Sequence, residues 1–520
     1  MALRRGGADL NIANGVREFA TNTPSVVAVR DGDRELTYAA LGERSSRLAC
    51  ALLSAGLRTG DPVAVLLGNR LEYCEVAAGI AKAGLVAVPL NPRLTAAEAR
   101  YILEHSGARA LVLDDAVAGI VADTVPDVDL RVVLSMDGTT VGTDYEQALA
   151  AARAADPMVH VDELAPFAYA YTSGTTGQPK GVMLSHRSRV LTFYATALDW
   201  GLGPGRRTVA IAPMYHGAGF AFAYAGVFTG GTLSMLRSFD PERALDLFER
   251  DRIQSAFLVP THAQLIRSVA PDGARGRRLA DLETLYFNAA ALPWPLKEWV
   301  LDAFPGVGVH ELYGSTEASV ATDLRPVDAR RKPGSVGLPW FMTEVKLLGP
   351  DGEPVPPDTP GELFSRSPMV MNGYLRNDAA TEECTTTDGF ITSGDIAVAD
   401  EEGYLTIVDR VKDMIITGGV NVYPREIENV LLEHPGVRDA AVVGQPDDTW
   451  GERVSAFVVL AEDVDLPQLE AHARQRLAGF KIPREWHVSE QLPRNAAGKL
   501  LKRELRRARG KAEDASVPGH

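Results

Sequence analysis

Helix and strand patterns alternate regularly from Leu36 to Asp115, and this alternation most constrains how the chain can fold. Thr37 can cap the first helix of this stretch, and Thr95 with Glu98 forms the capping box of a later one. The expected strands are 62–67, 85–90 and 109–113, and the expected helices are 37–56, 72–83 and 95–105. This β-α-β-α-β order predicts an α/β fold with mostly parallel sheets covered by helices.

The pattern changes after about Ser393, where short strands and two short helices follow one another. Pro424 suits the first turn of one of these helices. The segment forms an α+β unit of about 100 residues, a size typical of a separate domain. We place the boundary near Asp409, which predicts a large N-terminal domain at 1–409 and a small C-terminal domain at 410–520.

Charge and composition exclude several classes of function. The 520-residue chain has a net charge of −15, which argues against nucleic acid as a partner because phosphate backbones select basic surfaces. The uncharged stretch 208–236 contains a proline, a histidine and five glycines, so we expect strand, buried helix and strand there and no membrane span. With three scattered cysteines and no apolar leader after Met1, the expected location is the reducing cytoplasm.

A loop rich in glycine and hydroxyl groups follows an expected strand at 167–171. Its members are Thr172, Ser173, Gly174, Thr175, Thr176 and Gly177, and Lys180 comes shortly after. Glycines allow close backbone approach, hydroxyls and main-chain N–H groups donate, and lysine adds positive charge, so the loop suits phosphate. A flexible linker is the alternative, but it gives no reason for a lysine between proline and glycine. The P-loop pattern does not match, because Pro179 replaces its second glycine.

The run 171–186, YTSGTTGQPKGVMLSH, resembles the signature of the adenylate-forming superfamily, which includes acyl-CoA synthetases, nonribosomal peptide adenylation domains and luciferases. The resemblance extends over residues 26–503. It implies a mobile C-terminal domain and a two-step reaction, in which a carboxylic acid and ATP give acyl-AMP before the thiol of coenzyme A displaces AMP. The implied small molecules are therefore ATP, Mg²⁺ and coenzyme A, with Lys180 catalytic and the loop 172–177 binding phosphate.

A second motif is HELYGSTEAS at 310–319. An acidic side chain beside a phosphate-binding turn suits Mg²⁺, which bridges phosphate oxygens and keeps most of its waters, although Glu317 could instead begin a helix. The family motif Y-G-x-T-E is matched in full. The resemblance implies that Tyr313 stacks on adenine, Thr316 contacts the α-phosphate and Glu317 binds Mg²⁺, with Gly314 and Ser315 in the same nucleotide-binding turn.

Three further segments contribute nucleotide-site candidates. Small residues after an expected strand, at Asn288, Ala289 and Ala290, let a flat ring lie on the backbone, although ordinary packing would also explain them. The resemblance implies an adenine wall there, with Asn288 and Ala289 replacing the usual glycine-rich residues. Asp395 can accept both ribose hydroxyls, or it can be a turn residue. By resemblance, Arg410 contacts ribose or phosphate.

The resemblance also assigns residues of the C-terminal domain. Lys412 occupies the hinge position, and Gly418 with Gly419 lies in a loop that lines the thiol-acceptor tunnel. PRNAAGK at 493–499 matches the family motif in full and makes Lys499 the residue that neutralises charge during adenylation. On the residues alone, Lys499 would be one solubilising lysine among many.

PMYHGAG at 213–219 places His216 in the uncharged stretch. A lone histidine can be a core residue, but the family has an aromatic residue or histidine here, beside the reacting carboxylate. The stretch contains no Asp to pair a substrate ammonium, which disfavours an amino acid. The expected acyl pocket, at 215–223, 259–264 and around Asn288, has small, apolar and aromatic residues and suggests an uncharged acyl group.

The sequence thus predicts a carboxylate–CoA ligase for an apolar acid, fatty or aromatic, whose partners are small molecules. The alternatives left open are an enzyme that loads an acyl carrier protein, a luciferase-like oxidation of acyl-AMP, and a non-catalytic nucleotide or acyl sensor. A sensor could lose the charged site residues, and Lys180, Glu317, Asp395 and Lys499 are all present. The sequence also leaves a homodimer open.

Overall fold

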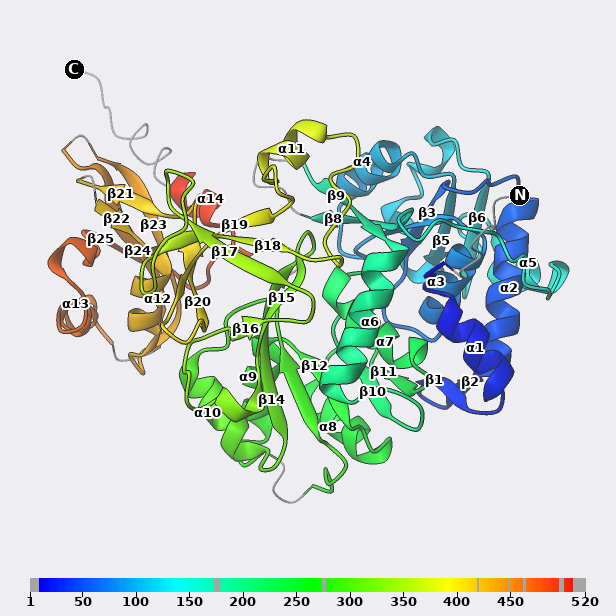
Figure 1. Ribbon diagram of the computed structural model, residues 1–520, viewed down its shortest axis with the longest axis horizontal. Helices are drawn as coiled ribbons and strands as arrows, with labels where there is room; N and C mark the ends of the chain where they lie inside the picture. Colours follow the sequence, from blue (N-terminus) through cyan, green and yellow to red (C-terminus); the bar gives the residue numbers. More distant parts are fainter. Residues whose placement is uncertain are drawn as a thin grey trace. The chain divides into compact units, whose positions relative to one another are not determined.

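The computed structural model describes residues 9–172, 178–273, 277–418, 420–447, 449–461, 464–494 and 500–507 (Figure 1). The chain divides into two compact units, residues 1–345 with 365–393, and residues 346–364 with 394–520. Residues 394–409 therefore group with the smaller unit, while the functional boundary near Asp409 stays a prediction. None of the helices in the described ranges is long and apolar enough to cross a membrane.

The larger unit has a seven-stranded sheet in the order β7-β6-β5-β3-β4-β8-β9. Its strands are β3 (Pro62–Leu66), β4 (Val86–Pro89), β5 (Ala110–Asp114), β6 (Val132–Met136), β7 (Thr143–Asp144), β8 (Pro166–Thr172) and β9 (Lys180–Ser185). All neighbours are parallel except β8 and β9, which form an antiparallel hairpin. The parallel sheet expected from the alternation at 36–115 is confirmed.

The same unit has a nine-stranded sheet in the order β16-β15-β14-β13-β12-β10-β11-β1-β2. Its strands are β1 (Val27–Asp31), β2 (Arg34–Thr37), β10 (Arg207–Ala210), β11 (Thr232–Met235), β12 (Ser255–Leu258), β13 (Thr284–Phe287), β14 (Gly308–Ser315), β15 (Ser319–Leu324) and β16 (Leu338–Pro339). The strands from β14 to β1 are parallel, and antiparallel strands close both edges. The carboxyl ends of the central strands therefore meet at one edge.

Helices and short 3₁₀ turns accompany these sheets. The helices are α1 (Asn14–Asn22), α2 (Tyr38–Ser54), α3 (Glu72–Lys82), α4 (Ala96–Ser106), α5 (Tyr145–Ala151), α6 (His186–Trp200), α7 (Gly217–Phe228), α8 (Pro241–Arg250), α9 (Pro260–Val269), α10 (Trp294–Ala303) and α11 (Asp378–Glu383), with 3₁₀ turns at Asp115–Ile120, Val125–Asp127 and Pro326–Asp328. The Thr37 hydroxyl accepts from the backbone N–H of Ala40, and the capping box of Thr95 and Glu98 is present. Both cap predictions are confirmed.

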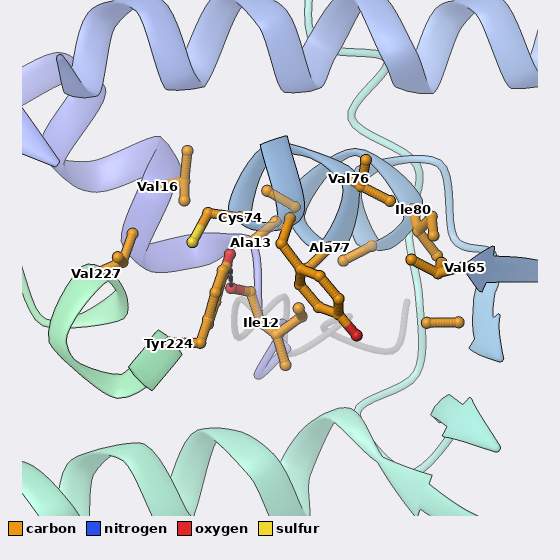
Figure 2. Packing of buried hydrophobic residues seen from close by; sticks show 14 of the residues in the cluster. Ile12, Ala13, Val16, Val65, Cys74, Val76, Ala77, Ile80, Tyr224 and Val227 are labelled. Atoms are coloured by element: carbon orange, nitrogen blue, oxygen red, sulfur yellow. Dashed lines mark hydrogen bonds between the residues drawn. The ribbon is translucent and has the colours of Figure 1, made fainter. Parts of the chain in front are cut away.

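Helix α3 is buried along its whole length. One side carries Val76, Ala77 and Ile80 towards Val65 of β3, as Figure 2 shows. On another side, Cys74 lies near the segment before α1 and near α7, whose Tyr224 hydroxyl donates 3.3 Å to the carbonyl of Ile12. A helix that is apolar on several sides belongs in the core, where its burial supplies much of the driving force for folding.

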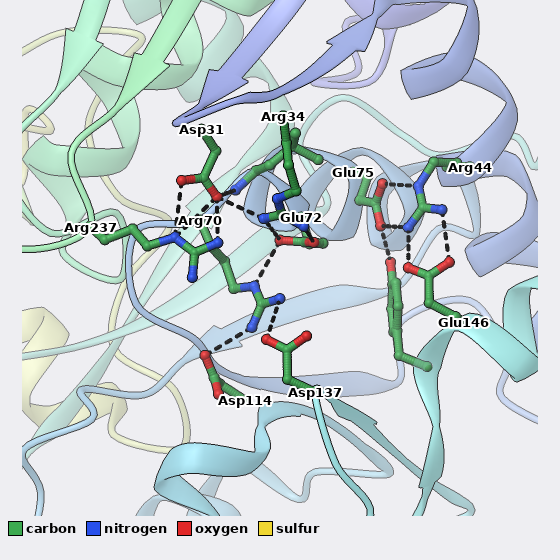
Figure 3. A network of polar contacts seen from close by, with 12 residues as sticks. Asp31, Arg34, Arg44, Arg70, Glu72, Glu75, Asp114, Asp137, Glu146 and Arg237 are labelled. Carbon is green, nitrogen blue, oxygen red and sulfur yellow. Dashed lines mark hydrogen bonds and ion pairs between the residues drawn. The ribbon is translucent and has the colours of Figure 1, made fainter. Parts of the chain in front are cut away.

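A network of ion pairs joins the two sheets of the larger unit (Figure 3). Arg70 is only 3% exposed and contacts Glu72 at 2.7 Å and Asp114 of β5 at 2.8 Å. Glu72 also receives Arg34 of β2 at 2.6 Å, and Arg237 contacts Asp31 of β1 at 2.7 Å. The buried charges of the network, Asp31, Arg70 and Glu72, each have a partner of opposite charge, because an unpaired buried charge is costly.

The smaller unit contains most of a four-stranded sheet and all of a five-stranded one. The first has the order β17 (Glu344–Leu348), β18 (Gly361–Arg366), β19 (Ile391–Ala399) and β20 (Leu405–Arg410). The second has the order β22 (Val420–Val422), β21 (Ile415–Thr417), β24 (Gly451–Leu460) and β23 (Val437–Asp447), and β25 (Glu485–Val488) also pairs with β24. The helices are α12 (Pro424–Leu432), α13 (Leu466–Arg474) and α14 (Lys502–Arg507), with a 3₁₀ turn at Gly479–Lys481. The expected α+β unit is confirmed.

Candidate active site

The glycine- and hydroxyl-rich loop connects two paired strands. Thr172 ends β8 and Lys180 begins β9, and the two residues are direct partners in the antiparallel register. The hairpin therefore fixes both ends of the loop and places Lys180 at its exit. The remaining predicted phosphate contacts lie outside the described residues, namely Ser173, Gly174, Thr175, Thr176 and Gly177.

Tyr374 connects the lysine of this hairpin to the predicted metal ligand. The Lys180 ammonium lies 4.8 Å from the centre of the Tyr374 ring, and the Tyr374 hydroxyl donates a 3.0 Å hydrogen bond to Oε1 of Glu317. Burial, and then the Glu317 carboxylate, raise the pKa of Tyr374, so its hydroxyl stays protonated and keeps donating. The structure thus gathers a cation, a phenol and a carboxylate from segments far apart in sequence.

Glu317 lies in a tight turn between β14 and β15, so the alternative that it begins a helix is wrong. A β carbon added to Gly314 would lie 1.9 Å from the Ser319 carbonyl oxygen, so the turn needs glycine there. The Ser315 hydroxyl accepts from the Ala318 N–H at 2.9 Å and from the Ser393 hydroxyl at 2.7 Å. These bonds hold the turn in which the predicted nucleotide contacts stand.

His216 directly precedes α7. The residue after it, Gly217, lies close to the turn that carries Thr316 and Glu317. A β carbon built on Gly217 would lie 3.8 Å from Oγ1 of Thr316. The His216 side chain is open to solvent, yet the protein around it lowers the pKa of the imidazole by desolvation. A side chain that is open to solvent but surrounded by protein lies in a concave site. Because its pKa is lowered, His216 is a neutral imidazole at neutral pH.

The predicted adenine wall follows β13, the parallel neighbour of β14. Because both strands run the same way, Asn288 and Tyr313 stand near the same edge of the sheet. Ala289 and Ala290 are exposed, and Ala289 has a left-handed φ of +74°. Two contacts hold the end of this segment. The Leu292 N–H donates a hydrogen bond to Glu311, and the Glu311 carboxylate also pairs with Lys297 at 2.9 Å. Both alanines are accessible, and their contact with adenine stays a prediction.

In the smaller unit, two of the predicted residues pair with each other. Asp395 on β19 is the register partner of Arg410 on β20, and the Arg410 Nε contacts its carboxylate at 2.7 Å. Lys412 stands in an exposed turn after β20. Gly418 has a φ of +58°, and an added β carbon would lie 2.8 Å from the Trp450 ring. Gly419 and Lys499 lie outside the described residues.

An apolar cavity opens beside His216. It includes part of the expected acyl pocket, at 215–217 and Phe220, but most of its wall comes from elsewhere. The other lining residues are Val65, Tyr73, Val76, Ala77, Ile80, Ala87, Pro89, Phe167, Ala168, Ala170, Leu184, Arg189 and Met214. The contributions of α3, β3 and β4 were not expected, because they come from residues more than 120 positions before His216.

Sequence reasoning missed two residues at this site. Tyr374 stands in the run VMNGYL, whose apolar pattern is interrupted by asparagine and glycine before an aromatic residue, and this was the available signal. Arg189 follows HRS in the sequence, and in that context it looks like an ordinary exposed basic residue. Only its burial in the structure separates it from Arg187.

Comparison with known proteins gives one consistent result. Residues 16–375 match a family model described as AMP-binding enzyme, and residues 426–499 match the AMP-binding enzyme C-terminal domain. These two ranges contain all of the predicted site residues except five of the smaller unit, which fall between them, namely Asp395, Arg410, Lys412, Gly418 and Gly419.

Three relatives illustrate the range of proteins that this chain resembles. A feruloyl-CoA synthase from Amycolatopsis is 39% identical over 94% of this chain and 97% of the relative. A fatty acid–[acyl-carrier-protein] ligase from Streptomyces coeruleorubidus is 36% identical over 94% of both chains. The solved structure of an o-succinylbenzoate CoA synthetase from Bacillus subtilis, in complex with its acyl-adenylate intermediate, is 31% identical, with a TM-score of 0.85 over 95% of this chain and 97% of that one.

Proposed function

Because this chain belongs to the AMP-binding enzyme family, we propose that it is an ATP-dependent carboxylate–CoA ligase acting on an acid with an apolar body, fatty or aromatic. In the proposed reaction, a carboxylate oxygen bonds to the α-phosphorus of ATP and pyrophosphate leaves. The thiol of coenzyme A then loses its proton, attacks the acyl carbon and displaces AMP. The observation that carries the proposal is the convergence of Lys180, Tyr374 and Glu317, with Thr316 next to the segment that holds His216.

The residues of the larger unit suit the adenylation step. Phosphoryl-group chemistry depends mainly on positioning and on stabilising charge. Lys180 supplies a positive charge at the exit of the phosphate loop, and Thr316 supplies a hydroxyl close to Gly217. The neutral His216 imidazole is the proposed contact of the reacting carboxylate. Asn288, Ala289 and Ala290, with Tyr313, are the proposed adenine contacts.

The residues present fit Mg²⁺, the metal that the family implies. Glu317 offers a hard carboxylate oxygen, and Tyr374 orients that carboxylate through Oε1, which leaves Oε2 for a metal or for water bound to one. When bound, Mg²⁺ would neutralise charge on the phosphates of ATP. Replacement of Glu317 by Gln should therefore weaken adenylation sharply and raise the Mg²⁺ concentration needed, and unchanged metal dependence would contradict the assignment.

We further propose roles for the smaller unit. Asp395, held by Arg410, is the proposed ribose contact, and Lys412 is the proposed hinge. Gly418 and Gly419 are the proposed contacts of coenzyme A, and Lys499 is the proposed cation for adenylation. Replacement of Lys499 by Ala should abolish pyrophosphate release from acid and ATP while thioester still forms from synthetic acyl-AMP and coenzyme A. Equal loss of both half-reactions would contradict this role.

One experiment separates the proposal from its nearest alternative. The purified full chain is incubated with ATP, Mg²⁺ and a panel of fatty and aromatic acids, and pyrophosphate release is measured. Coenzyme A or a free acyl carrier protein is then supplied as the acceptor. The proposal requires acyl-CoA to form, whereas transfer to the carrier protein alone would assign the chain to the second activity, as in the Streptomyces relative. Absence of pyrophosphate release with every acid would overturn both.

A further inference from the structure

Arg189 is a buried cation that no carboxylate of the described residues contacts. It is the fourth residue of α6 and is only 5% exposed. Its guanidinium Nε and Nη2 are buried, and within the described part of the chain neither has a hydrogen-bond partner. Desolvation lowers the pKa of Arg189 to about 10, so the side chain is still charged at neutral pH.

The contrast with Arg70 makes this feature unusual. Arg70 is equally buried, but its guanidinium contacts the carboxylates of Glu72 and Asp114 (Figure 3). A buried guanidinium without such partners costs folding free energy, because it has left water and gained nothing in return. A fold tolerates such a group where a ligand supplies the missing acceptor.

Arg189 lines the apolar cavity that opens beside His216. The surrounding wall consists of aliphatic and aromatic side chains, including Val76, Ala77 and Ile80 on the face of α3 shown in Figure 2. Arg189 is the single arginine or lysine among the described residues that line this cavity. An anion in this cavity would therefore find one strong partner, with apolar surface around it.

We propose that Arg189 binds a second carboxylate of the acid substrate, so that the enzyme activates a dicarboxylic acid whose two carboxyl groups are joined by an apolar linker. This inference rests on the proposed ligase function and replaces the uncharged acyl group that the sequence suggested. One carboxylate lies near His216 and Thr316 and reacts, while the other pairs with the guanidinium through a charge-assisted hydrogen bond.

A substrate of this kind explains the mixed character of the cavity. The linker contacts the apolar wall, and the distal carboxylate neutralises Arg189, the one arginine or lysine among the described lining residues. Binding a monocarboxylic acid of the same length would leave the guanidinium desolvated and unpaired, which selects against that acid. The cavity therefore discriminates by charge at the far end of the substrate.

The test compares acids of matched length with and without the second carboxylate. Pyrophosphate release is measured for adipate against hexanoate and for suberate against octanoate, with the full chain and with Arg189→Met. The wild-type chain should have the higher kcat/KM for each dicarboxylate. The variant should lower the ratio of the two kcat/KM values by about 10- to 100-fold, as expected for loss of hydrogen bonds between charged groups.

Arg187→Met is the matched control, because Arg187 is on the same helix but has a side chain that is 41% exposed and lies 3.7 Å from Glu163. It should leave the ratio unchanged. Thermal unfolding gives an independent readout. Arg189→Met should raise the unfolding temperature of the ligand-free chain, and adipate should stabilise the wild type but not the variant. Arg189→Lys, which keeps the charge and loses the fork, replaces the methionine variant if that one does not fold.

The outcomes separate this inference from the proposed function. An unchanged ratio in Arg189→Met, or equal losses with both kinds of acid, would overturn the role of Arg189 while leaving ligase activity intact. If the wild type releases no pyrophosphate with any acid, the proposed function fails. The thermal shift with adipate then decides alone whether Arg189 binds a dicarboxylate.

Discussion

Tyr374 donates a 3.0 Å hydrogen bond to Glu317 with its hydroxyl and lies 4.8 Å from Lys180 with its ring. One side chain thus touches both a carboxylate and an ammonium, which keeps the two apart and orients each. A direct Lys180–Glu317 ion pair would neutralise both groups before a nucleotide arrives. With Tyr374 between them, the lysine stays available for phosphate and the carboxylate for a metal.

Replacement of Tyr374 by Phe tests this arrangement. The variant keeps the ring beside Lys180 and removes only the hydrogen bond to Glu317. We expect kcat/KM for ATP to fall by about 10-fold or more and the Mg²⁺ concentration for half-maximal activity to rise, because orienting partners of metal ligands tune affinity. Acid-dependent ATP–pyrophosphate exchange across a magnesium titration measures both. Tyr194→Phe, at a residue that is 49% exposed, is the control, and the same magnesium curve in both variants would contradict this role.

Replacement of Gly314 by Ala should damage the turn that carries Thr316 and Glu317. The added β carbon would lie 1.9 Å from the Ser319 carbonyl oxygen, so the two strands must separate. A displacement of about 1 Å at a catalytic group can cost on the order of 100-fold in rate, and we expect a loss of at least that size in pyrophosphate release. Gly119→Ala is the control, since nothing lies within 4 Å of its added carbon. Comparable activity in the two variants would show that the turn tolerates the change.

Local sequence signals predicted the parts of the fold that depend on neighbouring residues. The cap at Thr37 and the capping box of Thr95 with Glu98 are examples, since donors and acceptors within four residues decide them. The uncharged stretch 208–236 also folds as expected, into β10, α7 and β11. Its proline and glycines break the apolar run where the helix and strands end.

Relationships between distant segments could not be predicted in this way. Tyr374 and Glu317 are 57 residues apart, and no periodicity connects them. The cavity wall from α3 and β3 is another case, because it depends on how the two sheets of the larger unit pack. Arg187 and Arg189 are the clearest example, since their sequence context is nearly the same and one is exposed while the other is buried.

A final prediction concerns a buried carboxyl group away from the proposed chemistry. Asp323 on β15 is 2% exposed, and its carboxylate contacts Nδ1 of His310 on β14 at 2.8 Å. It also faces the carboxylate of Asp199 at the end of α6, which Arg325 and the Trp340 indole N–H hold in place. Two facing carboxylates repel each other when both are ionised, which favours a proton on one of them. Burial, opposed by His310 and assisted by Asp199, raises the pKa of Asp323 to about 6.

The sign of the pH effect follows from this raised pKa. Between the unfolded value of 3.8 and about 6, the folded chain binds more protons at Asp323 than the unfolded chain, so its stability falls as pH rises through this window. A difference of about two pKa units corresponds to about 3 kcal/mol. Asp323→Asn removes this titration, so the free energy of unfolding of the variant relative to wild type should rise by about 3 kcal/mol from pH 3.8 to pH 7. Urea unfolding at pH 4, 5, 6 and 7 measures the difference, with Asp302→Asn, whose side chain is 66% exposed, as the control. A difference that does not change with pH would mean that Asp323 is ionised in the folded chain throughout this range.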